Sequence, residues 1–64
     1  MVISEYVGIN EWANRTATVS YSREEYTVSL FENGVWLRDV DTSMHSLSYA
    51  EDVAENWTIG IIKE

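Results

Sequence analysis

The chain has 64 residues, enough for one small domain, and it contains no cysteine, so neither disulfide bonds nor thiolate metal sites can support the fold. Eleven acidic residues against four basic ones give a net charge of −7, which argues against nucleic acid or an anionic membrane as a direct ligand, because both attract Lys and Arg. The same charge permits a basic protein as partner and would steer such a protein toward the chain.

The N-terminal segment, MVISEYVGINEW, fits two kinds of secondary structure. Side chains alternate between two faces over residues 2–7, which is typical of a strand, whereas Val2, Tyr6 and Ile9 also fall on one face of a helix. We favour the strand. The segment has no basic region of the kind that opens a signal peptide, and the chain has no run of ~18 apolar residues that could span a membrane. A cytoplasmic location is therefore expected.

Residues 15–38 have the pattern of an antiparallel meander. In RTATVSYS (15–22) and again in EYTVSLF (25–31), side chains alternate with a period of two and β-branched residues are frequent. The polar SREE between these runs predicts a turn. Asn33-Gly34 is the strongest short hairpin signal, because a type I′ turn requires positive φ at both central residues. We expect three strands, and a fourth if the N-terminal segment is extended.

The stretch SYAEDVAENW (48–57) predicts a helix. Ser48 followed three residues later by Glu51 fits a capping box, with Ser46 as a competing N-cap. Gly60 would either end the helix in a left-handed conformation or lie inside it as a weak point. An apolar stripe at steps of three and four would cover the sheet: Ala50, Val53, Ala54, Trp57 and Ile61. The chain should thus form a single α+β domain over residues 1–64, an antiparallel sheet of three or four strands with one C-terminal helix packed on one face.

The exposed side of this helix is expected to be uniformly negative. Glu51 and Asp52 would lie in its first turn, where the helix dipole favours negative charge, and Glu55 follows Glu51 by four residues, so these two carboxylates repel slightly. A surface helix ordinarily mixes charges of both signs, but no basic residue follows here until near the C-terminus. The face is either the solvated side of an acidic protein or a docking face for a basic partner, with Asp39 and Asp41 nearby.

The candidate catalytic and metal-binding patterns do not support an enzyme. DVDT at 39–42 has the D-x-D-T shape of haloacid dehalogenase phosphatases, whose chemistry needs a parallel scaffold and further acids that so short a chain cannot supply. An EF-hand loop starting at residue 39 would need Gly and Glu where Met44 and Ala50 stand. His45 is the one histidine, so no histidine cluster for zinc can form. We expect no catalytic residues, no metal and no cofactor.

The face of the sheet turned away from the helix is a second candidate surface. If Val28 and Leu30 pack on the helix, Phe31 points away from it, and Trp36 and Arg38 join Phe31 if the hairpin register allows. Aromatic side chains beside an arginine on an open face have the composition of an interface hot spot. A homodimer through this face would also help to stabilise so small a fold. Alternatively, the N-terminal segment folds over this face and buries it.

The segment YTVSLFENGVWLRDVDTSMHSLSYAEDVAENW resembles the small acidic orphan proteins of T4-like tailed phages, of the cyanophage type, and the resemblance covers roughly residues 26–62. The resemblance depends on a strand–hairpin–strand order followed by an acidic helix with Tyr, Ala and Trp. It implies expression in the cytoplasm of an infected bacterium, where many such proteins bind and inhibit a host enzyme, in some cases by imitating the charge of DNA. We therefore expect a non-enzymatic protein that binds a host protein through its negative helix face. The rival hypothesis is a homodimeric structural or assembly protein joined through the aromatic sheet face.

Overall fold

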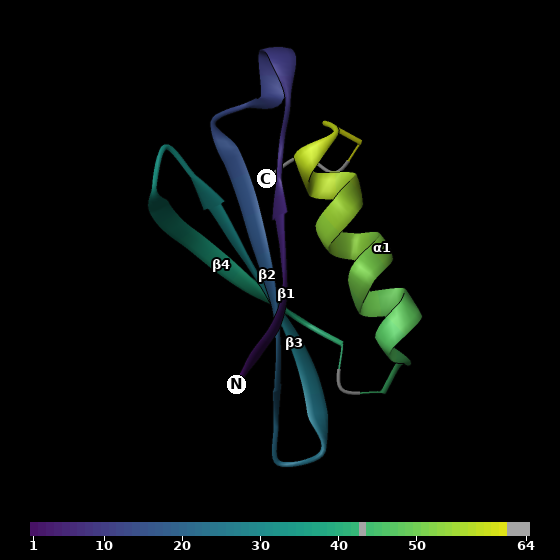
Figure 1. Ribbon diagram of the computed structural model, residues 1–64. Helices are drawn as coiled ribbons and strands as arrows, with labels where there is room; N and C mark the ends of the chain where they lie inside the picture. Colours follow the sequence, from purple (N-terminus) through teal and green to yellow (C-terminus); the bar gives the residue numbers. More distant parts are fainter. Residues whose placement is uncertain (43, 62–64) are drawn as a thin grey trace.

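The computed structural model describes residues 1–42 and 44–61 and shows an α+β fold. One antiparallel sheet of four strands, in the order β1-β2-β3-β4, has the helix α1 (Leu47–Thr58) packed on one face (Figure 1). The elements before the helix are β1 (Val2–Val7), a short 3-10 turn η1 (Asn10–Trp12), β2 (Arg15–Ser22), β3 (Glu25–Glu32) and β4 (Val35–Asp41). The predicted sheet and C-terminal helix are confirmed, and the N-terminal segment is the fourth strand rather than a helix.

Both hairpins of the meander have two-residue turns with positive φ at both central positions. Asn33 (φ 56°) and Gly34 (φ 78°) form the predicted turn between β3 and β4. The turn between β2 and β3 has the same signs at Arg23 (φ 54°) and Glu24 (φ 65°). A left-handed backbone costs such residues roughly 1–2 kcal/mol each. The polar sequence predicted a turn at this place but not its strained conformation.

The core lies between one face of the sheet and one stripe of α1. The register places Ala17 opposite Leu30 and Val19 opposite Val28, and all four side chains are fully buried. The helix covers them with four of the five predicted residues: Ala50, Val53, Ala54 and Trp57. The fifth, Ile61, lies past the end of the helix and is 66% exposed. Because two of the covering residues are alanines, the helix backbone can approach the sheet closely.

The start of α1 differs from the preferred prediction. The Ser46 hydroxyl accepts a hydrogen bond from the Tyr49 backbone N–H (3.3 Å), so Ser46 is the N-cap and Ser48 lies inside the helix. The competing N-cap is therefore the one observed. Because the helix begins earlier than the capping box predicted, its first turn contains no acidic residue. Glu51 and Asp52 lie in the second turn, where the helix dipole contributes little to them.

The end of α1 is a Schellman motif around a left-handed glycine. Gly60 has φ 83°, its N–H donates to the Trp57 carbonyl (3.3 Å), and the Ile61 N–H donates to the Asn56 carbonyl (2.9 Å). The sequence allowed either a cap or an internal weak point at this glycine, and the cap is observed. A side chain at Gly60 would also collide with the indole of Trp12, so this position needs both the conformation and the size of glycine.

Trp57 joins the helix to the sheet and to a buried arginine. Its indole N–H donates to backbone carbonyls of β2 and β3 (3.1 Å each), and its ring contacts the Arg15 guanidinium at 3.9 Å from the ring centroid. Trp12 contacts the same guanidinium at 4.6 Å, while Arg15 Nη1 donates to the Trp57 carbonyl (3.2 Å) and Nε lies 3.6 Å from Glu32 Oε2. Trp12 therefore packs at the end of α1 and does not cover the other face of the sheet.

Candidate functional site

Three carboxylates lie along the side of α1 that is next to β1. We call Glu51, Asp52 and Glu55 the acidic cluster. Asp52 and Glu55 are exposed and Glu51 is half-buried. The Ser4 hydroxyl on β1 donates a hydrogen bond to Glu51 Oε2 (3.4 Å), which connects the cluster to the edge strand of the sheet. The structure thus brings together the three predicted helix residues and adds an edge strand beside them.

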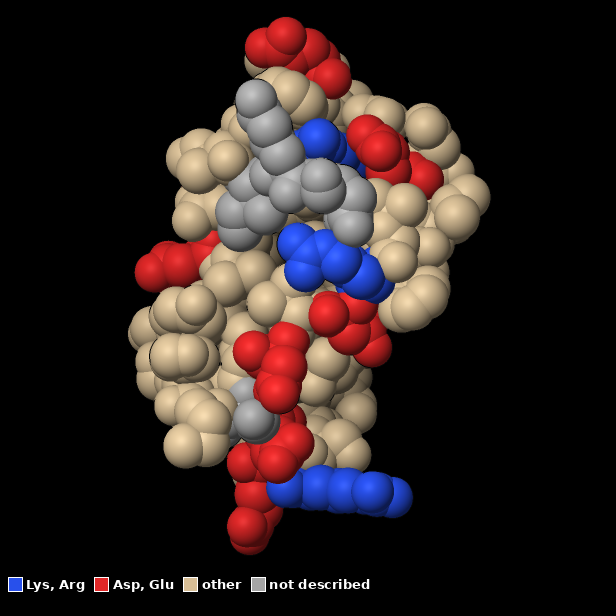
Figure 2. All heavy atoms as spheres, turned by 180° about the vertical axis from the view of Figure 1, so that it is seen from behind, with Lys and Arg blue, Asp and Glu red and all other residues tan. Residues whose placement is uncertain are grey.

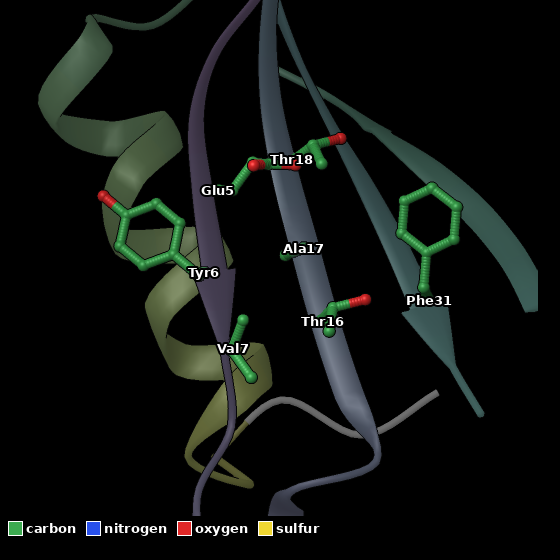
Figure 3. A pocket seen from close by; sticks show the side chains of 7 residues that line it. All are labelled: Glu5, Tyr6, Val7, Thr16, Ala17, Thr18 and Phe31. Atoms are coloured by element: carbon green, nitrogen blue, oxygen red, sulfur yellow. The ribbon is translucent and has the colours of Figure 1, made fainter. Parts of the chain in front are cut away.

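Tyr6 lies close enough to all three carboxylates to be affected by their charges. Its side chain leaves β1 toward the helix (Figure 3). Burial raises the pKa of the Tyr6 hydroxyl above its ordinary value of 10.0, and the charges of Glu51, Glu55 and Asp52 raise it further. Within the described residues, no Lys or Arg forms an ion pair with the cluster. The sequence did not identify Tyr6 as part of this site. Alternation along the strand places Tyr6 and Glu5 on opposite faces of the sheet, but it does not tell which of the two faces the helix covers.

The two predicted aspartates of β4 are separated from the acidic cluster. Asp39 pairs with Ser29 and Asp41 with Thr27 across the β3–β4 ladder. Both therefore lie on the side of the sheet away from α1, which we call the open face. The Asp39 carboxylate accepts hydrogen bonds from the Ser29 hydroxyl (2.7 Å) and from the Trp36 indole N–H (2.8 Å). These aspartates cannot extend the negative side of the helix, because the alternation of β4 turns them to the opposite face.

The open face presents the two predicted aromatic residues without the arginine. Phe31 and Trp36 are cross-strand partners, and Trp36 is 56% exposed. Arg38 pairs with the core residue Leu30, so its side chain leaves β4 on the helix side of the sheet. The register shift between Leu30 and Phe31, which leaves Leu37 without an opposite residue, sets this outcome. Among the described residues, β1 extends the sheet sideways instead of folding over the open face.

A shallow hollow of about 290 Å³ lies on the open face, at the low end of the size of small-molecule sites (Figure 3). Its lining consists of Glu5, Tyr6, Val7, Thr16, Ala17, Thr18 and Phe31. In Figure 3, Tyr6 points toward the helix, whereas Phe31 lies on the far side of β2. Among these described lining residues, Glu5 is the one carboxylate.

Thr42 and His45, which were considered above as parts of catalytic or metal-binding patterns, contact other residues of the fold. Thr42 is fully buried and its hydroxyl donates to the Tyr26 carbonyl (2.7 Å), which holds Thr42 against β3. His45 stacks on Tyr49 with 3.9 Å between ring centroids. Within residues 1–42 and 44–61, no three His, Asp or Glu side chains gather closely enough to hold a metal ion. The same residues contain no helix long and apolar enough to cross a membrane.

The charge on the molecule is distributed unevenly. Figure 2, which shows the side opposite to that of Figure 1, has acidic side chains in several separate groups with basic side chains between them. The negative charge of this view is therefore not one continuous patch.

Comparison of the chain with protein-family models, with curated proteins and with solved structures gave no match. The resemblance to small phage proteins stays a prediction.

Proposed function

We propose that this protein is a non-enzymatic interaction protein that binds a basic surface of another protein through the acidic cluster. The observation that supports this most is the gathering of three carboxylates beside Tyr6 without a cation from the described residues. Carboxylates at steps of three and four on a helix repel one another, and a basic partner would turn this repulsion into attraction. The net charge of −7 would also speed the encounter with such a partner.

The partner we propose is a host protein in an infected bacterium, in keeping with the resemblance to phage proteins. Enzymes that act on nucleic acid present basic surfaces, and the carboxylates of the acidic cluster would take the place of phosphates there. Side chains three or four positions apart on a helix lie ~5–6 Å from each other, which is compatible with this imitation. Asp39 and Asp41 lie on the open face and would not contribute to this imitation of phosphates. It would be limited to the acidic cluster, on the helix side of the sheet.

The test is an affinity pull-down from bacterial lysate at low and high salt, repeated with two charge-matched variants. Glu51→Lys with Glu55→Lys reverses the charge of the acidic cluster. Glu11→Lys with Glu24→Lys changes the net charge equally at exposed positions outside it. A partner retained by the wild type and the second variant, lost with the first, and eluted by salt supports the proposal. Equal retention by both variants refutes it, and competition by duplex DNA would support the proposed imitation of DNA phosphates.

A homodimer through the open face is the second candidate, supported by the exposed Trp36 and its half-buried cross-strand partner Phe31. Two observations favour the first candidate over it. Glu5, Asp39 and Asp41 lie on or around the same face, and each copy has a charge of −7, so that like charges oppose association. Sedimentation at increasing protein concentration and salt tests this candidate. A monomer under every condition would refute it.

A further inference from the structure

Strand β1 has a free edge, because among the described residues its one neighbouring strand is β2. The Gly8 N–H donates to the Arg15 carbonyl (2.9 Å) at the end of this ladder. In an antiparallel ladder, every second residue directs its N–H and C=O at the neighbouring strand, so Tyr6 also faces β2. Glu5 and Val7 therefore direct their N–H and C=O outward. These backbone groups are placed to bond a further strand.

The two faces of this edge differ in chemistry. On the helix side, Ser4 and Tyr6 adjoin the acidic cluster. On the open side, Val7 is 67% exposed. A strand added to β1 would lie about 4.8 Å outside it, with side chains alternating between the two faces. Residues opposite Ser4 and Tyr6 would point toward the carboxylates, and a residue opposite Val7 would lie beside the exposed apolar side chain of Val7, on the side that also carries Glu5.

We propose that the free edge of β1 binds an extended segment of the partner as a fifth, antiparallel strand, with basic side chains at alternate positions toward the acidic cluster and apolar side chains between them. This inference depends on the proposed function, because it uses the same carboxylates. It adds the form of the ligand, since backbone hydrogen bonds supply affinity in strand addition and the alternating side chains supply specificity. The opposite edge, β4, is less suited to this ligand because Arg38 lies on its helix side.

The probe is a capped seven-residue peptide in which lysine and valine alternate, compared with two backbone-methylated forms of equal charge. In the antiparallel arrangement, lysines lie opposite Ser4 and Tyr6 and valines lie opposite Glu5 and Val7. The valine amides then donate to β1, whereas the lysine amides point to solvent. Methylation of the valine amides should weaken binding about tenfold or more, and methylation of the lysine amides should leave it unchanged. Titration calorimetry measures all three affinities.

Amide hydrogen exchange locates the peptide on the protein. In the free protein, the amides of Glu5 and Val7 should exchange quickly and that of Tyr6 slowly, because only the last is bonded within the sheet. With the parent peptide bound, exchange at Glu5 and Val7 should slow about tenfold or more, while exchange at Tyr6 changes little. Unchanged exchange at Glu5 and Val7 in a saturated complex would overturn the inference.

The variant with both Glu51→Lys and Glu55→Lys separates this inference from the proposed function. One outcome is that the variant no longer binds the unmethylated peptide, while the wild-type protein binds both methylated peptides as tightly as the unmethylated one. Attachment is then by charge alone, so strand addition is wrong and the acidic cluster stays the binding surface. If valine methylation weakens binding but the variant binds normally, the edge accepts a strand and the role of the cluster is wrong. A parent peptide that binds neither protein overturns the inference alone if the pull-down still depends on the cluster.

Discussion

Exchanging the two hairpin turns of the meander should change stability in opposite directions. Both turns have two residues at positive φ, but one uses Asn33-Gly34 and the other Arg23-Glu24. The first variant carries Arg23→Asn with Glu24→Gly, and the second carries Asn33→Arg with Gly34→Glu. Each exchange removes or adds one positive and one negative charge together, so the net charge of −7 does not change. All four positions are exposed, and the backbone conformation is therefore the main quantity altered.

The expected magnitude follows from the φ angles. Arg23 at 54° and Glu24 at 65° are in the left-handed region, where residues with a Cβ lose roughly 1–2 kcal/mol each, and Asn and Gly lose less. The glycine of the first variant also lowers the free energy of unfolding by about 0.5–1 kcal/mol, because glycine has more conformational freedom in the unfolded chain. The first variant should gain about 1 kcal/mol or slightly more in the free energy of unfolding. In a domain of this size that raises Tm by about 4–8 °C.

Equilibrium urea unfolding, followed by tryptophan fluorescence, measures the free energy of both variants, and calorimetry gives Tm. The second variant should lose about as much as the first gains, because it places the strained residue types in a turn of the same kind. The reasoning is refuted if the first variant is no more stable than the wild type, or if the second loses nothing. A change in the slope of the free energy of unfolding against urea concentration would instead indicate that the folded or unfolded state had changed in compactness.

Three further outcomes are expected. Replacing Trp57 with Phe should cost about 2–4 kcal/mol in urea unfolding, because two partly buried carbonyls lose their donor and a gap opens, whereas Trp36→Phe on the surface should cost less than about 1 kcal/mol. Gly60→Ala should cost about 1–3 kcal/mol and displace the Trp12 indole, which a shift in fluorescence would report; unchanged stability and spectrum would contradict the role assigned to this glycine. Burial and the acidic cluster raise the pKa of Tyr6, so the folded chain holds this proton longer than the unfolded chain does; stability is complete below pH 10.0 and falls as the pH rises above it. That fall should be smaller in Tyr6→Phe, and identical pH profiles for the two proteins would contradict it.

The candidate surfaces show where local sequence patterns reach their limit. The period of two in β4 predicted that Trp36 and Arg38 would share a face, but the register shift at Leu30 and Phe31 decided which face each strand position takes. Trp36 lies on the open face with Asp39, and Arg38 lies on the other. A bulge depends on how two strands pair, and no residue type in the sequence predicted this register shift.

The sequence by itself determined the class and order of the elements. Alternation over residues 15–31, the Asn33-Gly34 turn, and the apolar stripe of the helix are local signals, because strand period, turn conformation and helix period each involve residues close in the chain. Tertiary structure decided which elements meet. Tyr6 lies beside Glu51 because β1 pairs with β2 and α1 packs across the same sheet, and Arg15 lies between two tryptophans from distant segments. Such contacts depend on the packing of the whole domain, which a single stretch of sequence does not specify.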